Sequence, residues 1–178
     1  MTEAEIARQI SNERVVVGDF REVNLPLGAY DLVVANHVLE HLDNPTAGLC
    51  RIRDLLALGG RAVLVYPNPQ SLGARMFGDA WYPWEVPRHL VLPQVRALAR
   101  AASSIGLTPI DVKTRCEKHA KGYFAQSRAY KTGKFVTGSS PIVTWTDQMI
   151  AMFERILITI GLDVGEEAIL VFEKRRLS

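Results

Sequence analysis

Ionisable side chains follow an apolar run near residue 30. Residues 30–35 are mostly apolar, and Asn36, His37, Glu40 and His41 come soon after them. An imidazole exchanges its proton near neutral pH, so such a cluster can bind a ligand or move a proton. A buried strand that runs into polar side chains is typical of the ligand-binding edge of a sheet.

Two other apolar runs also end in polar residues. Three valines precede Asp19, and a later run ends in Tyr66 and Asn68. The carboxyl ends of parallel strands meet at one edge of a sheet. We therefore expect Asp19, Tyr66 and Asn68 on the same rim as Asn36 and His37.

The elements that would position these residues alternate along the chain. Strands are predicted at residues 14–20, 30–36, 61–69, 108–115 and 166–175. Helices are predicted at residues 3–10, 46–58, 93–107 and 143–160, the second ending at Gly59-Gly60. Residues 69–92 are expected to be irregular and aromatic, and residues 113–141 lack clear periodicity. This alternation favours one α/β domain over residues 1–178 with a largely parallel sheet.

Composition excludes several classes of protein. The 178 residues are 48% hydrophobic and 22% charged, with a net charge of +2, which favours neither nucleic acid nor membrane as a partner. The two cysteines match no metal-ligand spacing, and no metal site is predicted. The longest apolar tract carries Asp147, Glu154 and Arg155, and the first residues do not resemble a signal peptide. We expect a cytoplasmic protein without a membrane span.

An ordered set of motifs resembles the class I S-adenosylmethionine-dependent methyltransferases. The set comprises a strand ending in GD, YDLVV leading into NHVLEHL, a helix closing on GG, and a strand ending in PN. WYPWEVPRHL and GEEAILVFEK are similar to a subgroup that acts on small molecules. The resemblance covers nearly the whole chain. It implies a Rossmann-like sheet with an antiparallel last strand, S-adenosylmethionine as cofactor and a small-molecule acceptor.

The resemblance assigns four residues to the cofactor. Asp19 matches the acid that accepts a hydrogen bond from the adenine amino group, and Phe20 matches the residue that flanks the adenine ring. Asn36 and His37 match the segment that lines the methionine end. The alternatives are a turn aspartate after a strand and a solvated strand end.

The same resemblance places the acceptor near His41. This side chain is the candidate general base for a hydroxyl acceptor, although a capping role at a helix start explains it equally well. Arg88 and His89 look like acceptor-side residues on a lid formed by residues 69–92.

Aromatic side chains and two strand-end residues complete the predicted acceptor site. Trp81, Tyr82 and Trp84 would wall the pocket, and Tyr66 and Asn68 would share its rim. Alternatively, the aromatic residues pack an irregular loop onto the sheet.

A basic segment carries a separate question. Residues 113–134 contain seven Lys or Arg residues and one Glu, with interleaved Tyr123, Phe124 and Tyr130. A single-stranded nucleic acid would suit this mixture, and an anionic acceptor is a second option. A solvated connecting segment explains it as well, and we favour that interpretation.

The N-terminal third of the family pattern is missing from this sequence. No glycine-rich loop follows a first strand, and no second strand ends in an acid. The missing strands lie mid-sheet, between residues 14–20 and 30–36, and would leave apolar edges unpaired. We therefore expect an N-terminally truncated sheet, rearranged or completed by a second copy. Such a chain should bind S-adenosylmethionine poorly on its own.

Two functions from different classes follow. The first is S-adenosylmethionine-dependent methyl transfer to a small molecule, inactive if the truncated chain cannot hold the cofactor. The second is a non-catalytic methyltransferase-like module that docks a protein on the helix at 143–160, through Ile150, Phe153, Leu157 and Ile160. That stripe could equally pack on the chain's own sheet, which we favour. A nicotinamide-dependent oxidoreductase is disfavoured, because it too needs a glycine-rich first turn.

Overall fold

The computed structural model describes residues 15–116, 120–134 and 141–176. Its strands are β1 (Tyr30–Asn36), β2 (Leu56–Pro67), β3 (Leu107–Arg115) and β4 (Glu167–Lys174). Its helices are α2 (Pro45–Leu55), α3 (Leu72–Phe77), α4 (Val95–Ser104), α5 (Ala120–Lys131) and α6 (Trp145–Thr159), with 3-10 turns at Leu39–His41, Gly78–Ala80 and Tyr82–Trp84. None of these helices is long and apolar enough to span a bilayer. The helix expected at residues 3–10 lies outside the described residues.

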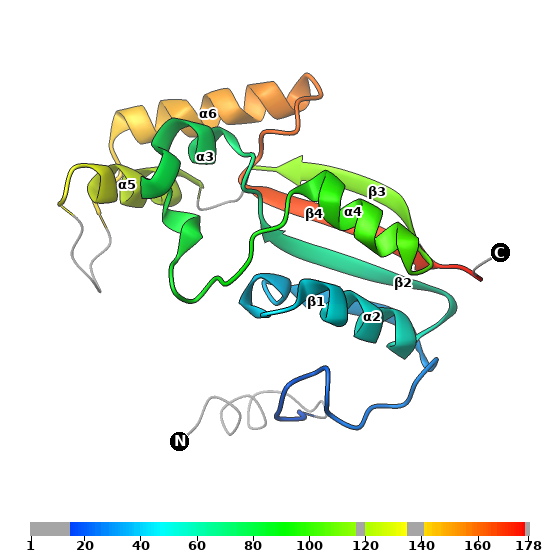
Figure 1. Cartoon of the computed structure of the whole chain (residues 1–178). Coiled ribbons are helices and arrows are strands. Elements are labelled where there is room, and N and C mark those ends of the chain that lie inside the picture. The colour runs from blue at the N-terminus through cyan, green and yellow to red at the C-terminus, as the bar shows by residue number, and fades with distance from the viewer. Residues whose placement is uncertain (1–14, 117–119, 135–140, 177–178) are drawn as a thin grey trace.

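The strands form one mixed sheet in the order β1-β2-β4-β3. β1 and β2 are parallel, whereas β4 runs antiparallel to both of its neighbours. The predicted α/β fold with an antiparallel last strand is confirmed, and its parallel part is a single pair among the described strands. Figure 1 shows α2 and α4 lying along the sheet, while α3, α5 and α6 gather beyond one of its ends.

The core lies between the sheet and the two helices along it. Alternate residues of the central strands, such as Leu64 and Leu170, are fully buried. They belong to one cluster with Ile52 of α2 and Leu98 of α4. This packing fixes the carboxyl ends of β1 and β2, from which the polar residues project.

The opposite face of the sheet is poorly covered at β1. Leu32 and Val34 are 56% and 57% exposed, although their neighbours Val33 and Ala35 belong to or contact the core. A strand with apolar side chains on both faces is normally covered by other elements on both sides of the sheet. Among the described residues, that cover is absent on this side, in agreement with a truncated sheet.

Two predictions of local structure were wrong. The predicted strand at 14–20 is absent from its described part, where residues 15–17 are unpaired and Asp19 starts a turn by accepting hydrogen bonds from the backbones of Glu22 and Val23. Gly59-Gly60 does not end a helix, because β2 already begins at Leu56. A side chain at Gly60 would lie 2.8 Å from the Tyr30 carbonyl oxygen, so the close approach of β1 accounts for this glycine.

α5 is a helix where no periodicity predicted one. Its buried side includes Phe124, but also Ala120, Ala125, Ser127 and Ala129. Small and polar residues give little hydrophobic contrast between the two sides of a helix, so the amphipathic signal is weak. The predicted helix at 143–160 is confirmed as α6, and α3 adds a short helix to the irregular region at 69–92.

Candidate functional site

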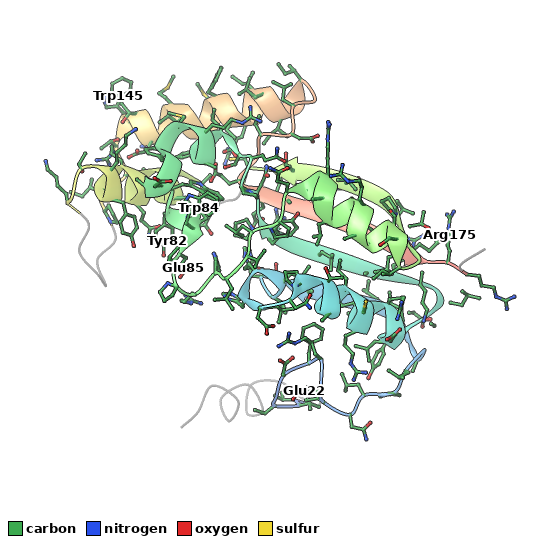
Figure 2. All side chains as sticks on the ribbon, viewed as in Figure 1. Glu22, Tyr82, Trp84, Glu85, Trp145 and Arg175 are labelled. Atoms are coloured by element: carbon green, nitrogen blue, oxygen red, sulfur yellow. The ribbon has the colours of Figure 1, made fainter. Side chains whose placement is uncertain are left out.

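A pocket of about 220 Å³ opens at the carboxyl ends of β1 and β2. Its walls come from the turn after β1, the end of β2, the segment 82–89, α5 and the start of β4. Tyr82 and Glu85 lie on the segment that descends from α3 in Figure 2. Tyr82 packs beside Tyr123 of α5, with ring centroids 5.9 Å apart. The pocket therefore has one aromatic wall and one wall of ionisable side chains.

His37 lies between two carboxylates at the inner end of the pocket. Its Nδ1 is 3.0 Å from Glu40 Oε1, and its Nε2 is 3.0 Å from Glu167 Oε1. Hydrogen bonds to Glu167 and then to Glu40 raise the pKa of His37 to about 9. The imidazole is therefore a cation at neutral pH. Its backbone is in the left-handed region, with φ of 52°.

Glu167 joins this cation to a second one. Its Oε2 accepts a hydrogen bond of 2.7 Å from Arg115 Nε. Burial would raise the pKa of the Glu167 carboxyl, but the hydrogen bonds from His37 and Arg115 outweigh burial, and the pKa is lowered. Glu167 is thus an anion held between two cations.

Glu40 is fully buried in the turn after β1. Its Oε1 contacts His37, whereas its Oε2 is buried with no hydrogen-bond partner among the described residues. The Glu40 backbone carbonyl accepts hydrogen bonds from Leu90 and Val91, at 2.7 and 3.3 Å. These bonds fix the end of the segment 82–91 against the sheet.

His41 and His89 face each other across the pocket mouth. Their ring centroids are 4.9 Å apart. His41 Nδ1 lies 2.9 Å from the Arg88 carbonyl oxygen, and His89 Nδ1 lies 2.7 Å from the Pro83 carbonyl oxygen. The Arg88 guanidinium pairs with Glu85 at 2.5 Å.

Three predicted acceptor residues are buried and do not line the pocket. Trp81 is 1% exposed and donates from Nε1 to Glu166 Oε2 at 2.7 Å. Asn68 is buried and donates to the Gly165 carbonyl oxygen at 2.9 Å. Tyr66 is fully buried, and burial raises the pKa of its phenol. These side chains support the pocket floor.

Trp84 belongs to the same supporting layer. Its ring meets Trp81 edge-on at 5.3 Å, and its Nε1 donates to the Gly78 carbonyl oxygen at 3.0 Å. Of the three predicted aromatic residues, the structure therefore places Tyr82 at the pocket and the two tryptophans beside it.

The predicted cofactor residues other than His37 lie away from this pocket. Asn36 is exposed at the end of β1, and Phe20 packs against the core cluster. Both oxygens of Asp19 are engaged by Arg21, whose Nη2 lies 2.6 Å from Oδ2. Arg21 also contacts Asp43 at 2.5 Å. The hydrogen bonds from Arg21 lower the pKa of Asp19 to about 2, so this acid is an ion already paired within the chain.

S-adenosylmethionine fits these residues incompletely. The residues predicted for the methionine end, Asn36 and His37, lie at the strand end, but Asp19, predicted to accept from the adenine amino group, already pairs with Arg21. Beside the open edge of β1, the described residues form an apolar groove of about 360 Å³ lined by Val16, Leu25, Leu32 and Val34 among others. Apolar side chains cannot satisfy the hydroxyl groups of a ribose.

Sequence reasoning did not assign six of the residues that line the pocket. They are Glu85, Tyr123, Glu166 and Glu167, together with Pro67 and Pro83. Glu166 and Glu167 stand at the start of an apolar strand, whereas His37 was identified at the end of one. An antiparallel strand presents its first residues, not its last, at this edge of the sheet.

A family model described as a methyltransferase domain matches residues 3–112, more than half of the chain. The chain belongs to this methyltransferase family. The curated proteins include no match to the methyltransferase sequence.

Solved structures share the fold of this methyltransferase chain. One is a methyltransferase in complex with the Haloferax volcanii Trm112 methyltransferase activator, with a TM-score of 0.64, 13% identity and coverage of 98% of this chain and 68% of that one. A Thermotoga maritima SAM-dependent methyltransferase has a TM-score of 0.62 and 14% identity, and the match covers 97% of this chain and 69% of that one. A third is the Burkholderia thailandensis 1,6-didemethyltoxoflavin-N1-methyltransferase with bound 1,6-didemethyltoxoflavin and S-adenosylhomocysteine. Its TM-score is 0.52 and its identity 14%, and the match covers 97% of this chain and 56% of that one. At these identities the likeness concerns the fold.

Proposed function

We propose that this methyltransferase chain serves S-adenosylmethionine-dependent methyl transfer to a small-molecule hydroxyl or amine in the cytoplasm. The observation that carries the proposal is the pocket of ionisable side chains at the carboxyl ends of β1 and β2. Ligands of such sheets bind at this edge. The acceptor would occupy the pocket, with residues 69–92 as its cover.

The side chains of the pocket suit an acceptor that must be oriented and deprotonated. The neighbouring rings of Tyr82 and Tyr123 offer an aromatic wall for a flat or apolar group. His41 presents Nε2 as the proton acceptor, because its Nδ1 is held by the Arg88 carbonyl oxygen. His37 and Arg88 add positive charge for polar groups of the acceptor. S-adenosylmethionine supplies the methyl group as a sulfonium, so the protein mainly positions the acceptor and removes its proton.

The described residues supply part of a cofactor site, and we expect the chain alone to bind S-adenosylhomocysteine weakly. Nuclear magnetic resonance detects such binding through amide shifts. We predict shifts that centre on Phe20, Asn36 and His37, with a dissociation constant on the order of 1 mM. Arg21→Gln should strengthen the binding, because it releases the Asp19 carboxylate for the adenine amino group.

Asp19→Ala is the matched control for that measurement. It should cancel the gain from Arg21→Gln in the double variant. A folded protein without any shift at saturating ligand would contradict cofactor use by this chain, and shifts elsewhere on the surface would contradict the assigned residues.

The open side of β1 further supports association of two copies through this edge. β1 ends the sheet, and its exposed Leu32 and Val34 adjoin the apolar groove. Unpaired apolar edges promote pairing with another chain. We predict a dimer by light scattering that Val34→Lys dissociates. Ile110→Lys, at an exposed position of the opposite edge strand, should leave the dimer intact. A monomeric wild-type protein would contradict this prediction.

A second function has its own observation. α6 leaves Met149, Met152, Phe153 and Ile156 at least 49% exposed, and Ile160, which follows the helix, is 68% exposed. Of the predicted stripe, Ile150 packs inward against the cluster of Phe124 and Ala151, whereas Phe153 and Ile160 are exposed. An exposed apolar helix face suits an apolar protein partner, and one structural neighbour was solved with an activator protein. A folded chain that shows no S-adenosylhomocysteine-dependent shifts would favour this non-catalytic module.

A further inference from the structure

Three side chains at the pocket bring metal-ligand atoms together. Glu40, His41 and His89 each place one candidate donor atom within 4.8 Å of the other two. Two of them come from the turn after β1, and His89 comes from a segment almost 50 residues later. The fold, and not local sequence, therefore creates the cluster.

The hydrogen bonds of the two histidines leave the same nitrogen available on each ring. Nδ1 of His41 faces the Arg88 carbonyl oxygen, and Nδ1 of His89 faces the Pro83 carbonyl oxygen. A carbonyl oxygen only accepts, so each Nδ1 carries a hydrogen. In the neutral ring the lone pair is then on Nε2. A backbone carbonyl that holds the distal N–H in this way is the usual support of a metal-binding histidine.

Glu40 contributes a carboxylate oxygen that lacks a partner. The side chain is fully buried, and its Oε2 has no hydrogen-bond partner among the described residues. Its other oxygen is already held by His37. A buried oxygen left in this state is costly, and a bound cation would relieve the cost.

Glu85 supplies an independent sign that something cationic belongs at His89. Glu85 Oε2 lies 3.4 Å from His89 Nε2. With the hydrogen of the neutral ring on Nδ1, a lone pair and a carboxylate oxygen would face each other. A metal ion bound between such atoms would turn this repulsion into attraction.

We propose that Glu40, His41 and His89 bind a divalent transition-metal ion, with Glu85 within reach as a fourth ligand. Two imidazole nitrogens and one carboxylate favour Zn²⁺ or Fe²⁺ over Mg²⁺ or Ca²⁺, which prefer oxygen. Ligands of a tetrahedral Zn²⁺ lie about 3.3 Å apart, given bonds of about 2.0 Å. Donor atoms up to 4.8 Å apart must therefore approach one another by as much as about 1.5 Å, through rotation of the side chains.

The inferred site goes beyond the proposed methyl transfer and does not depend on it. His41 and His89 line the pocket and Glu40 lies next to His41 in the turn after β1, so a free coordination position would face an acceptor oxygen. Such a cation lowers the pKa of a bound hydroxyl. If methyl transfer occurs here, the metal would replace His41 as the means of deprotonation, because both roles use Nε2.

Calorimetric titration of the chelator-treated 178-residue protein with Zn²⁺ tests the site. We expect one ion per chain with a dissociation constant on the order of 1 µM. His41→Gln and His89→Gln should each weaken binding at least tenfold, as should Glu40→Gln if it folds. His119→Gln, which removes the fourth histidine of the chain, is the matched control and should retain wild-type affinity.

Co²⁺ in place of Zn²⁺ reports which atoms bind. Nitrogen and oxygen ligation is expected, without the intense charge-transfer band of a thiolate. A thiolate band, unchanged affinity in the two histidine variants, or no binding by the folded protein would overturn the proposal. Weak S-adenosylhomocysteine binding is read separately from amide shifts, so the failure of either proposal leaves the other distinguishable.

Discussion

Replacing His37 with asparagine is expected to lower the free energy of unfolding by about 2 kcal/mol at pH 7. The imidazolium is the hydrogen-bonded cation that joins Glu40, which is fully buried, to Glu167. Removing one partner of a buried ion pair costs about 3–5 kcal/mol, because the other charge is left uncompensated. We discount that range because the His37 side chain is 35% exposed and water screens part of the interaction.

Asparagine removes the charge of His37 without straining the backbone at this position. His37 has a φ of 52°, and asparagine tolerates this left-handed conformation better than most residues. The loss measured by urea unfolding therefore reports the missing cation and not a strained turn. The second substitution Glu40→Gln should recover most of the loss, since it removes the carboxylate that was left without a partner. A single variant as stable as the wild-type protein would show that His37 does not compensate these acids.

The strands and long helices of this chain could be predicted because their residues repeat with the right period. β1, β3, α4, α6 and β4 were found within three residues of their observed bounds, whereas β2 begins at Leu56 and not at the predicted residue 61. The strand predicted at residues 14–20 was wrong for a physical reason. The valines there are apolar enough for a strand, but no described strand lies beside them to pair with. Helix α5 was missed because alanine and serine make up most of its buried side.

The pocket could be predicted in part, because position at a strand end is visible in a sequence. His37, His41, Arg88 and His89 all line it. The direction of a side chain is not visible in the same way. Trp81 turns inward because Glu166 offers a buried acceptor for its indole, and that acid lies 85 residues away. The pairing of antiparallel β4 with β2, which brings Glu167 opposite Pro67, could not be read from local patterns.

Charge on a second buried acid also limits the stability of this fold. Glu154 of α6 is fully buried, and its Oε1 accepts a hydrogen bond of 2.7 Å from the Glu166 backbone. Burial, with a smaller contribution from the negative charge of Glu166, raises the pKa of Glu154 from 4.5 to about 7. Cys116 and Arg155 act in the opposite direction but do not cancel it. The folded protein therefore binds this proton more tightly than the unfolded chain does.

We compare the free energy of unfolding of Glu154→Gln with that of the wild-type protein. The advantage of the variant is expected to be about 2–3 kcal/mol larger above pH 7 than at pH 4. The protonated acid stabilises the wild-type fold fully below pH 4.5, and that contribution is lost as the pH rises through about 7. Glutamine stays neutral and keeps an oxygen for the Glu166 backbone, so its stability should lack this fall. Urea unfolding across pH 4 to 8 measures the difference, and Glu22→Gln corrects for the same change in net charge at an exposed position. Parallel profiles for Glu154→Gln and the wild-type protein would mean that water or a neighbouring cation already stabilises the Glu154 anion.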